Sequence, residues 1–239
     1  MVLHVHNLVK KYGSQAILDG VSATFEQGKC YLLLGENGAG KSTLANCIAG
    51  GEVYDSGSIY RNDAVFHAYD QTAIQYQSFE SYPNLKIREV IVLFQKLITN
   101  PSNIQELYDL LDIVSFEHIL MKHASGGQRK AVSIILAFLL NKPIILLDEP
   151  FADLDLTKKK KLQQFLTTQL QEGKIMIVIS HEVAGFESLF DYVYILQKGQ
   201  MIEHGTKDEV QKKYQNTIFP GIEGIYFEVT GQVLGGKVG

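Results

Sequence analysis

Three short apolar runs stand out along the chain, and each one is followed directly by a stretch that contains polar residues. The runs are Cys30–Leu34 (CYLLL), Ile144–Leu147 (IILL) and Ile175–Ile179 (IMIVI). Uninterrupted apolar runs of this length are typical of strands that are buried on both faces of a sheet. LHVHNL near the N-terminus instead alternates apolar and polar residues, which predicts a half-exposed strand.

Three further segments are predicted to be helices: Lys41–Ala49, Leu85–Ile98 and Ile104–Leu111. The first contains no helix breaker and is closed by two glycines, which suits a helix with a glycine stop. Apolar residues at helical spacing also follow the lysine run Lys158–Lys161; they are Leu162, Phe165, Leu166 and Leu170. We therefore interpret the four lysines as the solvated start of a helix rather than as a phosphate- or lipid-binding patch.

Composition changes this picture mainly by excluding classes of protein. The chain has 239 residues, of which 46% are hydrophobic and 20% charged, and its net charge is −4. This is an ordinary globular profile without the basic excess of a nucleic-acid-binding protein. The longest apolar run, Ile134–Leu140, falls far short of the ~18 residues of a membrane span. Cys30 and Cys47 fall in predicted core elements, so we expect no disulfide and a reducing cytoplasm. We expect His4 and His6 to face solvent rather than to bind a metal.

The first apolar run is followed at once by GENGAGKST, residues 35–43. Gly35, Gly40, Lys41 and Ser42 meet the pattern G-x-x-x-x-G-K-[ST]. Glycines let the backbone curl so that successive N–H groups point at one anion, the lysine adds positive charge for outer phosphates, and the serine hydroxyl can ligate Mg²⁺. With a strand before it and a helix after it, this loop predicts a nucleoside triphosphate site; the alternative is a glycine-rich turn without a ligand.

Polar groups also follow the other two apolar runs. Asp148 and Glu149 follow the second run, and His181 follows the third. Because α/β sheets bind ligands at the carboxyl ends of their strands, one carboxylate is expected to hold Mg²⁺ and the other to orient or deprotonate a water. The histidine is expected to donate a hydrogen bond to a γ-phosphate. The alternatives are a helix N-cap or solvated turn for the acids and a structural or surface role for the histidine.

A second glycine turn, ASGGQ at residues 124–128, opens another predicted helix. A helix N-terminus favours anions, and one nucleotide already has its loop at residues 35–43. This second anion site is consistent with contact to a nucleotide that is held by another copy of the chain. A plain Ser/Gly N-cap is the alternative, and the sequence leaves both open.

These motifs, in this order, resemble those of the ATP-binding subunits of ABC transporters, and the resemblance covers almost the whole chain. GENGAGKST is similar to their Walker A loop, IILLDEP to their Walker B strand, ASGGQ to their signature and ISH to their switch histidine. The stretch Tyr76-Gln77-Ser78, followed by SYPNLKIRE, resembles the Q-loop, and Phe151–Asp155 resembles the D-loop. Tyr12, in KKYG, matches the aromatic residue that stacks on adenine in the family.

The resemblance implies an α/β fold of the P-loop NTPase, ABC-ATPase type. Such a fold has a RecA-like core, an antiparallel β subdomain and an inserted helical subdomain. We expect a single domain over residues 1–239, with the helical subdomain at roughly 80–140 and a short C-terminal tail at 220–239.

The family mechanism then implies roles for the matching residues. Lys41 and the amides of residues 38–43 bind the phosphates, and Glu149 polarises the attacking water. Mg²⁺ is held by Ser42, Gln77 and Asp148. The implied catalytic residues are Lys41, Gln77, Glu149 and His181. The implied nucleotide-binding residues are Tyr12, Gly35, Asn37, Gly38, Ala39, Gly40, Lys41, Ser42, Thr43, Ser125, Gly126, Gly127 and Gln128.

The resemblance also implies partners. The signature of one subunit completes the site of the opposing subunit, so that a head-to-tail homodimer or heterodimer encloses two ATP molecules, with Asp155 communicating across the interface. Gln77 and the helical subdomain contact a separate transmembrane permease, through which the chain meets the inner face of the cell membrane; no nucleic-acid partner is expected. Ala124 and Ala131 replace a usual leucine and a common arginine of the family, but neither change removes a catalytic group.

We therefore expect an ATP-hydrolysing subunit that powers a bacterial permease. The short tail and the separate permease favour export of a drug or peptide. The alternatives are the ATPase of an importer, a soluble ATPase outside transport such as a cluster-assembly factor, and a nucleotide-sensing module without turnover.

Overall fold

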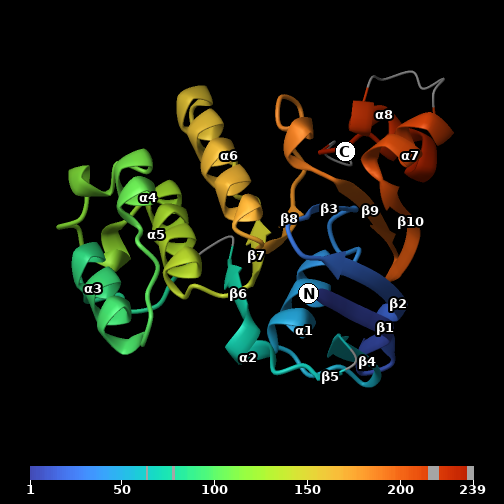
Figure 1. Ribbon diagram of the computed structural model, residues 1–239, viewed down its shortest axis with the longest axis horizontal. Helices are drawn as coiled ribbons and strands as arrows, with labels where there is room; N and C mark the ends of the chain where they lie inside the picture. Colours follow the sequence, from blue (N-terminus) through green and yellow to red (C-terminus); the bar gives the residue numbers. More distant parts are fainter. Residues whose placement is uncertain (63, 77–78, 215–220, 236–239) are drawn as a thin grey trace.

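The computed structural model describes residues 1–62, 64–76, 79–214 and 221–235. Over these residues the largest layer is a six-stranded sheet with the strand order β10-β9-β3-β8-β7-β6 (Figure 1). Its strands are β3 (Cys30–Leu34), β6 (Thr72–Gln75), β7 (Ile144–Asp148), β8 (Ile175–Ile179), β9 (Tyr192–Gln197) and β10 (Gln200–Thr206). All neighbouring pairs are parallel except β9 and β10.

The three apolar runs form the adjacent strands β3, β8 and β7, as predicted. Every residue of these strands is buried except Asp148, which is half-buried at the end of β7. A strand in the middle of a sheet that is covered on both sides needs apolar side chains pointing both ways, which explains the uninterrupted runs. Because the strands are parallel, the polar residues that follow them emerge along the same edge of the sheet.

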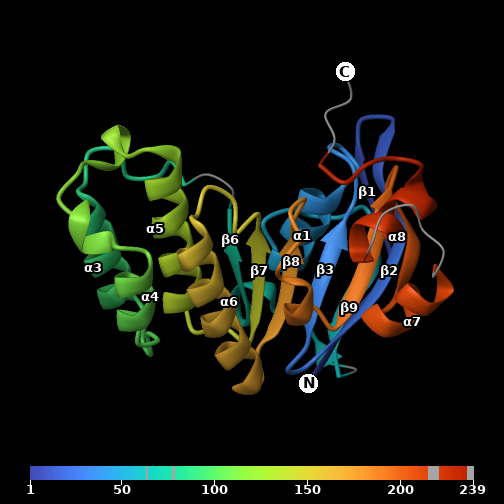
Figure 2. The same ribbon diagram turned by 90° about the horizontal axis from the view of Figure 1, so that it is seen from above.

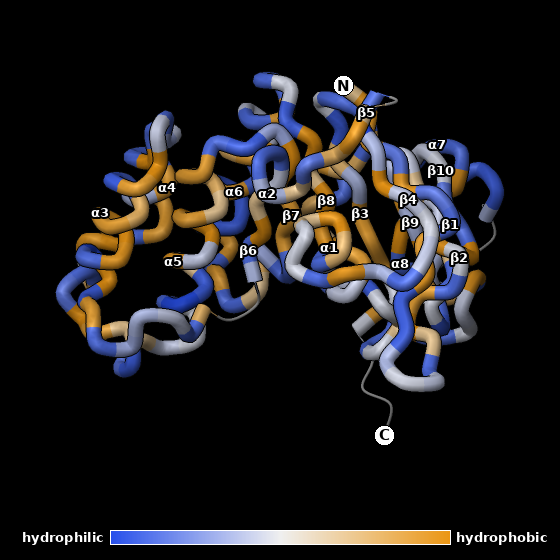
Figure 3. Tube along the Cα trace, turned by 90° about the horizontal axis from the view of Figure 1, so that it is seen from below, coloured by the Kyte–Doolittle hydropathy of each residue, from blue (hydrophilic) through white to orange (hydrophobic). Residues whose placement is uncertain are grey.

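Alternate side chains of β3 enter two different cores. Leu32 and Leu34 pack with one apolar cluster, whereas Tyr31 and Leu33 pack with another on the opposite face. The first cluster contains apolar residues of α5 (Gly126–Leu139) and α6 (Leu156–Gln171). The second contains α1 (Lys41–Ala49), and Figure 3 shows hydrophobic colouring along β3, β7 and β8 between these layers.

A second, antiparallel sheet covers the outer side of α1. Its strand order is β2-β1-β4-β5, and its strands are β1 (Val2–Tyr12), β2 (Gln15–Glu26), β4 (Ser56–Arg61) and β5 (Ala64–Val65). Leu3, Val5 and Leu8 of β1 are buried in the cluster that also holds Leu44 and Ile48 of α1. The predicted half-exposed strand is therefore confirmed, and α1 lies between two sheets.

Helices between β6 and β7 form a group at one end of the molecule, opposite the antiparallel sheet (Figures 1 and 2). They are α3 (Ile87–Leu97), α4 (Gln105–Leu110) and α5. Short 3-10 turns occur at Ile113–Ser115, Met121–His123 and Glu187–Leu189. The remaining helices are α2 (Ala68–Gln71), α7 (Lys207–Lys213) and α8 (Gly221–Thr230). The predicted division into one domain, with a subdomain at 80–140 and a tail at 220–239, stays a prediction.

None of the helices in the described ranges has the length and apolarity that a bilayer crossing needs. Cys30 and Cys47 are buried free thiols. His6 is exposed as expected, whereas His4 is half-buried and stacks on Tyr60 with the ring centroids 4.9 Å apart.

Candidate nucleotide site

Two glycines hold the loop between β3 and α1 tightly against the rest of the protein. A Cβ at Gly35 would lie 2.3 Å from the carbonyl oxygen of Leu196, and a Cβ at Gly40 would lie 2.7 Å from that of Ile17. Gly38, by contrast, has a φ of 81° and nothing within 4 Å of the position of a Cβ. The loop therefore has a crowded outer side and an open inner side, which suits the close approach of a phosphate group to the backbone.

Lys41 places its ammonium group inside this loop. Its Nζ donates hydrogen bonds to the carbonyl oxygens of Gly35, at 2.6 Å, and Glu36, at 2.8 Å. The residue is only 6% exposed, and burial lowers the pKa of Lys41, while the nearby charges of Asp148 and Glu149 act in the opposite sense. A buried ammonium whose hydrogen-bond partners are main-chain carbonyl oxygens rather than carboxylates is well suited to the negative charge of a polyphosphate.

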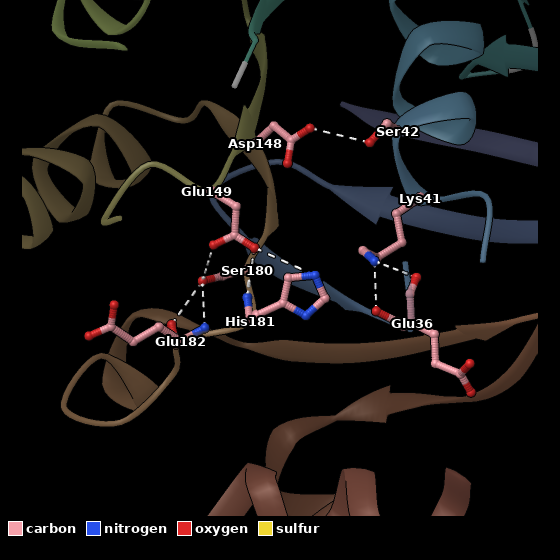
Figure 4. A network of polar contacts seen from close by, with 9 residues as sticks. Glu36, Lys41, Ser42, Asp148, Glu149, Ser180, His181 and Glu182 are labelled. Carbon is pink, nitrogen blue, oxygen red and sulfur yellow. Dashed lines mark hydrogen bonds and ion pairs between the residues drawn. The ribbon is translucent and has the colours of Figure 1, made fainter. Parts of the chain in front are cut away.

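A cavity of about 410 Å³ lies between this loop and the ends of β7 and β8. Its lining residues are Asn37, Lys41, Ser42, Asp148, Glu149, Ala152, Ile179, His181 and Glu182. Six of the predicted site residues thus meet around one space, although they come from three separate parts of the chain. Figure 4 shows the loop side chains facing those that follow β7 and β8.

Ser42 and Asp148 bring two oxygen ligands together on the wall of this cavity. The Ser42 hydroxyl donates a hydrogen bond of 3.3 Å to Oδ2 of Asp148 (Figure 4). Burial raises the pKa of Asp148, and the hydrogen bond from Ser42 and the charge of Lys41 counteract this. Hydroxyl and carboxylate oxygens are the ligands that Mg²⁺ takes in nucleotide sites, so these residues fit the metal that the sequence implies. Gln77, the third predicted ligand, lies outside the residues that the structure describes.

Glu149 is held in an unusual backbone conformation at the end of β7. Its φ is 54°, and its N–H donates to the carbonyl oxygen of Ile179 at 2.8 Å. Its carboxylate accepts a hydrogen bond of 2.9 Å from the main-chain N–H of His181 and one of 3.2 Å from the Ser180 hydroxyl. Burial raises the pKa of Glu149, against the effect of these two hydrogen bonds. Neither hydrogen bond uses the imidazole of His181.

The His181 ring lies beside this carboxylate, with Nε2 3.8 Å from Oε1 of Glu149. Burial lowers the pKa of His181, and the positive charge of Lys41 lowers it further. The ring is therefore neutral at neutral pH, with one nitrogen able to donate a hydrogen bond. The next residue, Glu182, forms an ion pair with Lys159. The interpretation of the lysine run as wholly solvated is therefore wrong for Lys159, which α6 turns toward this loop.

The signature residues lie at the start of α5 and line no part of this cavity. Ser125 and Gln128 form a capping box, in which the Gln128 N–H donates to Oγ of Ser125 at 3.2 Å and the Ser125 N–H donates to Oε1 of Gln128 at 2.8 Å. Gly126 and Gly127 have nothing within 4 Å of the position of a Cβ. Helix capping accounts for the serine and the glutamine, and a phosphate contact across a dimer stays a prediction.

Tyr12 and Asp155 have other contacts in this structure. The Tyr12 hydroxyl contacts Glu52, and Nζ of Lys10 lies 4.9 Å from the centroid of its ring. Oδ1 of Asp155 accepts a hydrogen bond of 2.9 Å from the Lys158 N–H, so this residue caps α6. Stacking on adenine and communication between subunits stay predictions for these two residues.

Two polar residues outside the predicted set also support the site. Ser180 bonds to Glu149, and Gln75 is fully buried at the end of β6 with its amide against the main chain of Asp148. The signal for Gln75 was a glutamine within the otherwise mostly apolar stretch TAIQ of a core strand.

Comparison with known proteins agrees with this geometry. The model of the family "ABC transporter" matches residues 18–152, which is more than half of the chain. The chain is 29% identical over 235 residues to "Probable sulfate/thiosulfate import ATP-binding protein CysA" of Chlorella vulgaris, covering 94% of this chain and 100% of that protein. It is 31% identical to "Ribose import ATP-binding protein RbsA" of Caldanaerobacter subterraneus subsp. tengcongensis over 88% of this chain and 46% of that protein.

A solved structure described as "Structure of ATP binding subunit of ABC transporter" superimposes with a TM-score of 0.83 and 26% identity, covering 96% of this chain and all of the other. The fold class expected from the sequence, with an antiparallel β subdomain beside a parallel core sheet, is thereby confirmed. The chain belongs to the ABC transporter family and is an ATP-binding subunit that couples ATP hydrolysis to transport.

Proposed function

We propose that this chain hydrolyses ATP in the cavity between Lys41, Asp148 and Glu149 and thereby drives solute import by a separate permease. The observation that carries the proposal is the convergence of an ammonium group, a hydroxyl–carboxylate pair and a second carboxylate on one space. Phosphoryl transfer to water requires these groups, because its catalysis rests on positioning and on the stabilisation of charge.

Each group has a distinct task in this proposal. The ammonium of Lys41 and the N–H groups of the loop bind the outer phosphates of ATP. Ser42 and Asp148 hold Mg²⁺, which when bound neutralises charge on the phosphate oxygens. The carboxylate of Glu149 orients the attacking water and accepts its proton, and the neutral ring of His181 donates a hydrogen bond to the γ-phosphate.

A second ATPase subunit completes the site. The open backbone around Gly126 and Gly127 supports this, because a phosphate could approach the start of α5 without meeting a side chain. Ser125 of the partner subunit then lies against the γ-phosphate, and the dimer closes around two ATP molecules. All the catalytic groups named above are present in this chain, so a homodimer would have two competent sites; a heterodimer is the alternative.

Import is favoured over export by the names of the relatives. Both relatives described above are import proteins, for sulfate or thiosulfate and for ribose, and these names support the importer alternative rather than the export that the sequence favoured. We place the chain at the inner face of a cell membrane, which it contacts through the permease. The net charge of −4 gives no support to a nucleic-acid partner.

A Glu149→Gln variant tests the catalytic assignment. We expect it to bind ATP, to dimerise more tightly than the wild type and to hydrolyse little, because the amide cannot accept a proton from water. Glu172→Gln, at the exposed end of α6, is the matched control and should hydrolyse ATP at the wild-type rate. Wild-type hydrolysis by Glu149→Gln would reject the assignment.

Purification from solubilised membranes tests the partner and the direction of transport. We expect a multi-span permease to copurify with the chain. In vesicles with this ATPase on the outside, external ATP should move solute out of the lumen, toward the ATPase side. Movement away from that side would show export, and copurification of soluble scaffold proteins alone would reject a transporter.

A further inference from the structure

The side chain of Gln75 closes the gap between the ends of β6 and β7. Its Nε2 donates to the carbonyl oxygens of Tyr76, at 2.6 Å, and Asp148, at 3.1 Å, and its Oε1 accepts from the Asp148 N–H at 3.1 Å. The residue is fully buried. One amide therefore satisfies both main-chain groups of Asp148 that face β6.

The strand register explains why a side chain is needed here. Gln75 is the last residue of β6 and is paired with Leu147, so that the ladder ends one residue before Asp148. Buried main-chain N–H and C=O groups require partners, and no β6 backbone lies opposite Asp148 to supply them. The Gln75 amide takes the place of the missing strand residue.

A carboxamide supplies both the donor and the acceptor that this position needs. Carbonyl oxygens only accept hydrogen bonds, so the NH₂ group of Gln75 must face the Tyr76 and Asp148 carbonyls, and its oxygen must face the Asp148 N–H. A leucine would leave the Asp148 N–H and C=O without these partners. A glutamate would place an acceptor oxygen against two carbonyl oxygens. The residue type is therefore matched to the main chain of Asp148 and not merely to the volume of the site.

The clamped peptide comes directly before Glu149, whose φ of 54° is unfavourable for a residue with a side chain. Such a conformation persists only when its surroundings fix it. The Glu149 N–H is held on the β8 side by Ile179, and Gln75 holds the preceding residue on the β6 side. These contacts fix the main chain from which the Glu149 side chain extends, and the hydrogen bonds from His181 and Ser180 hold its carboxylate.

We propose that Gln75 is a positioning residue for ATP hydrolysis, which fixes the main chain of Asp148 and thereby the carboxylate of Glu149. The inference rests on the catalytic role given to Glu149 under the proposed function. Gln75 is not among the residues that line the cavity, so its loss should affect the chemical step far more than ATP binding.

Steady-state kinetics of Gln75→Leu against Ser133→Ala test the proposal. The Ser133 hydroxyl accepts a hydrogen bond of 3.1 Å from the Tyr76 N–H, so this control removes a buried bond from the same strand end without touching Asp148. We expect Gln75→Leu to lower kcat by about 10- to 100-fold with little change in the Kd for ATP. Ser133→Ala should keep the wild-type kcat. Equal losses in the two variants, or a wild-type kcat in Gln75→Leu, would overturn the proposal.

Amide hydrogen exchange of the nucleotide-free protein gives a second readout. Gln75→Asn is one methylene shorter and cannot reach both main-chain groups of Asp148, and it is the variant to use if Gln75→Leu does not fold. Peptides that contain Asp148 and Glu149 should exchange faster in Gln75→Asn, whereas peptides from β3 should not change. Unchanged exchange at Asp148 would contradict the clamp.

A double variant separates the two proposals. If Gln75 acts through Glu149, adding Gln75→Leu to Glu149→Gln should reduce the residual single-turnover rate no further. A further loss in rate as large as that caused by Gln75→Leu alone would contradict the inference and leave the role of Glu149 unchanged. Wild-type hydrolysis by Glu149→Gln alone would instead sink the proposed catalytic role.

Discussion

The main-chain N–H of His181 donates a 2.9 Å hydrogen bond to Oε1 of Glu149, and this bond joins the residues that follow β8 and β7. The donor belongs to the backbone, so every substitution of the histidine except proline keeps it. The position of the carboxylate and the hydrogen bonding of the imidazole can therefore be tested separately.

A His181→Ala variant should lose the imidazole and keep the geometry of Glu149. We expect kcat to fall by about 10²-fold or more, because a hydrogen-bond donor to the γ-phosphate is lost, while the Kd for ATP changes little. Kinetics and equilibrium nucleotide binding check this. Hydrolysis at the wild-type rate would show that the ring contributes nothing to the chemical step.

Magnesium dependence should respond to the Ser42–Asp148 pair. Asp148→Asn replaces a charged oxygen ligand with a neutral amide, so we expect the Mg²⁺ concentration for half-maximal hydrolysis to rise by about 10- to 100-fold. ATP binding in the presence of EDTA should change less, because Lys41 and the loop amides remain. An unchanged Mg²⁺ titration would remove Asp148 from the metal site.

Replacement of a glycine by alanine should lower the free energy of unfolding more at Gly40 of the loop than at Gly13 of the β1–β2 turn. Gly40→Ala combines a φ of 106° with a contact of 2.7 Å to the Ile17 carbonyl, so we expect it to lower the free energy of unfolding by more than the about 1 kcal/mol of left-handed strain alone. Gly13→Ala, in the β1–β2 turn with a φ of 61° and free space around it, is the control for strain alone. Urea denaturation of the nucleotide-free proteins measures both, and equal losses would contradict the steric argument.

The pH dependence of stability should reveal the buried carboxyl group of Glu149. Burial raises its pKa above the ordinary value of 4.5, so the folded protein holds this proton more tightly than the unfolded chain does. The wild type therefore loses stability as the pH rises through the range above 4.5. The Glu149→Gln protein has no carboxyl group to titrate at this position, so its stability lacks this decrease. We expect the variant to have the higher Tm at pH 7.5, with an advantage that shrinks toward pH 4.5.

The sequence pattern predicted the central strands because a sheet that is covered on both faces requires apolar side chains at successive positions of these strands. Leu32 and Leu33 point to opposite cores, and both must be apolar. The loop was equally predictable, since Gly40 meets two neighbours that exclude any side chain. In both cases a local requirement restricts the residue type at the position itself.

Contacts between distant parts of the chain could not be predicted in this way. Gln75 meets Asp148, 73 positions further along, and nothing in TAIQ shows where that amide points. Lys159 was misinterpreted for the same reason, because its partner Glu182 comes from another strand end. The role of Ser125 depends on a second subunit, and the pattern of one chain gives only its helix-capping environment.

Lys41 donates to two carbonyl oxygens of its own loop, and this has a practical consequence for inactive variants. The ammonium acts as an internal scaffold that ties together the main chain of the loop. A Lys41→Ala protein would lose this scaffold together with the charge, so weak binding by such a protein would report a deformed loop as well as a missing contact. Inactive variants that keep Lys41 are therefore better controls in titrations of nucleotide binding.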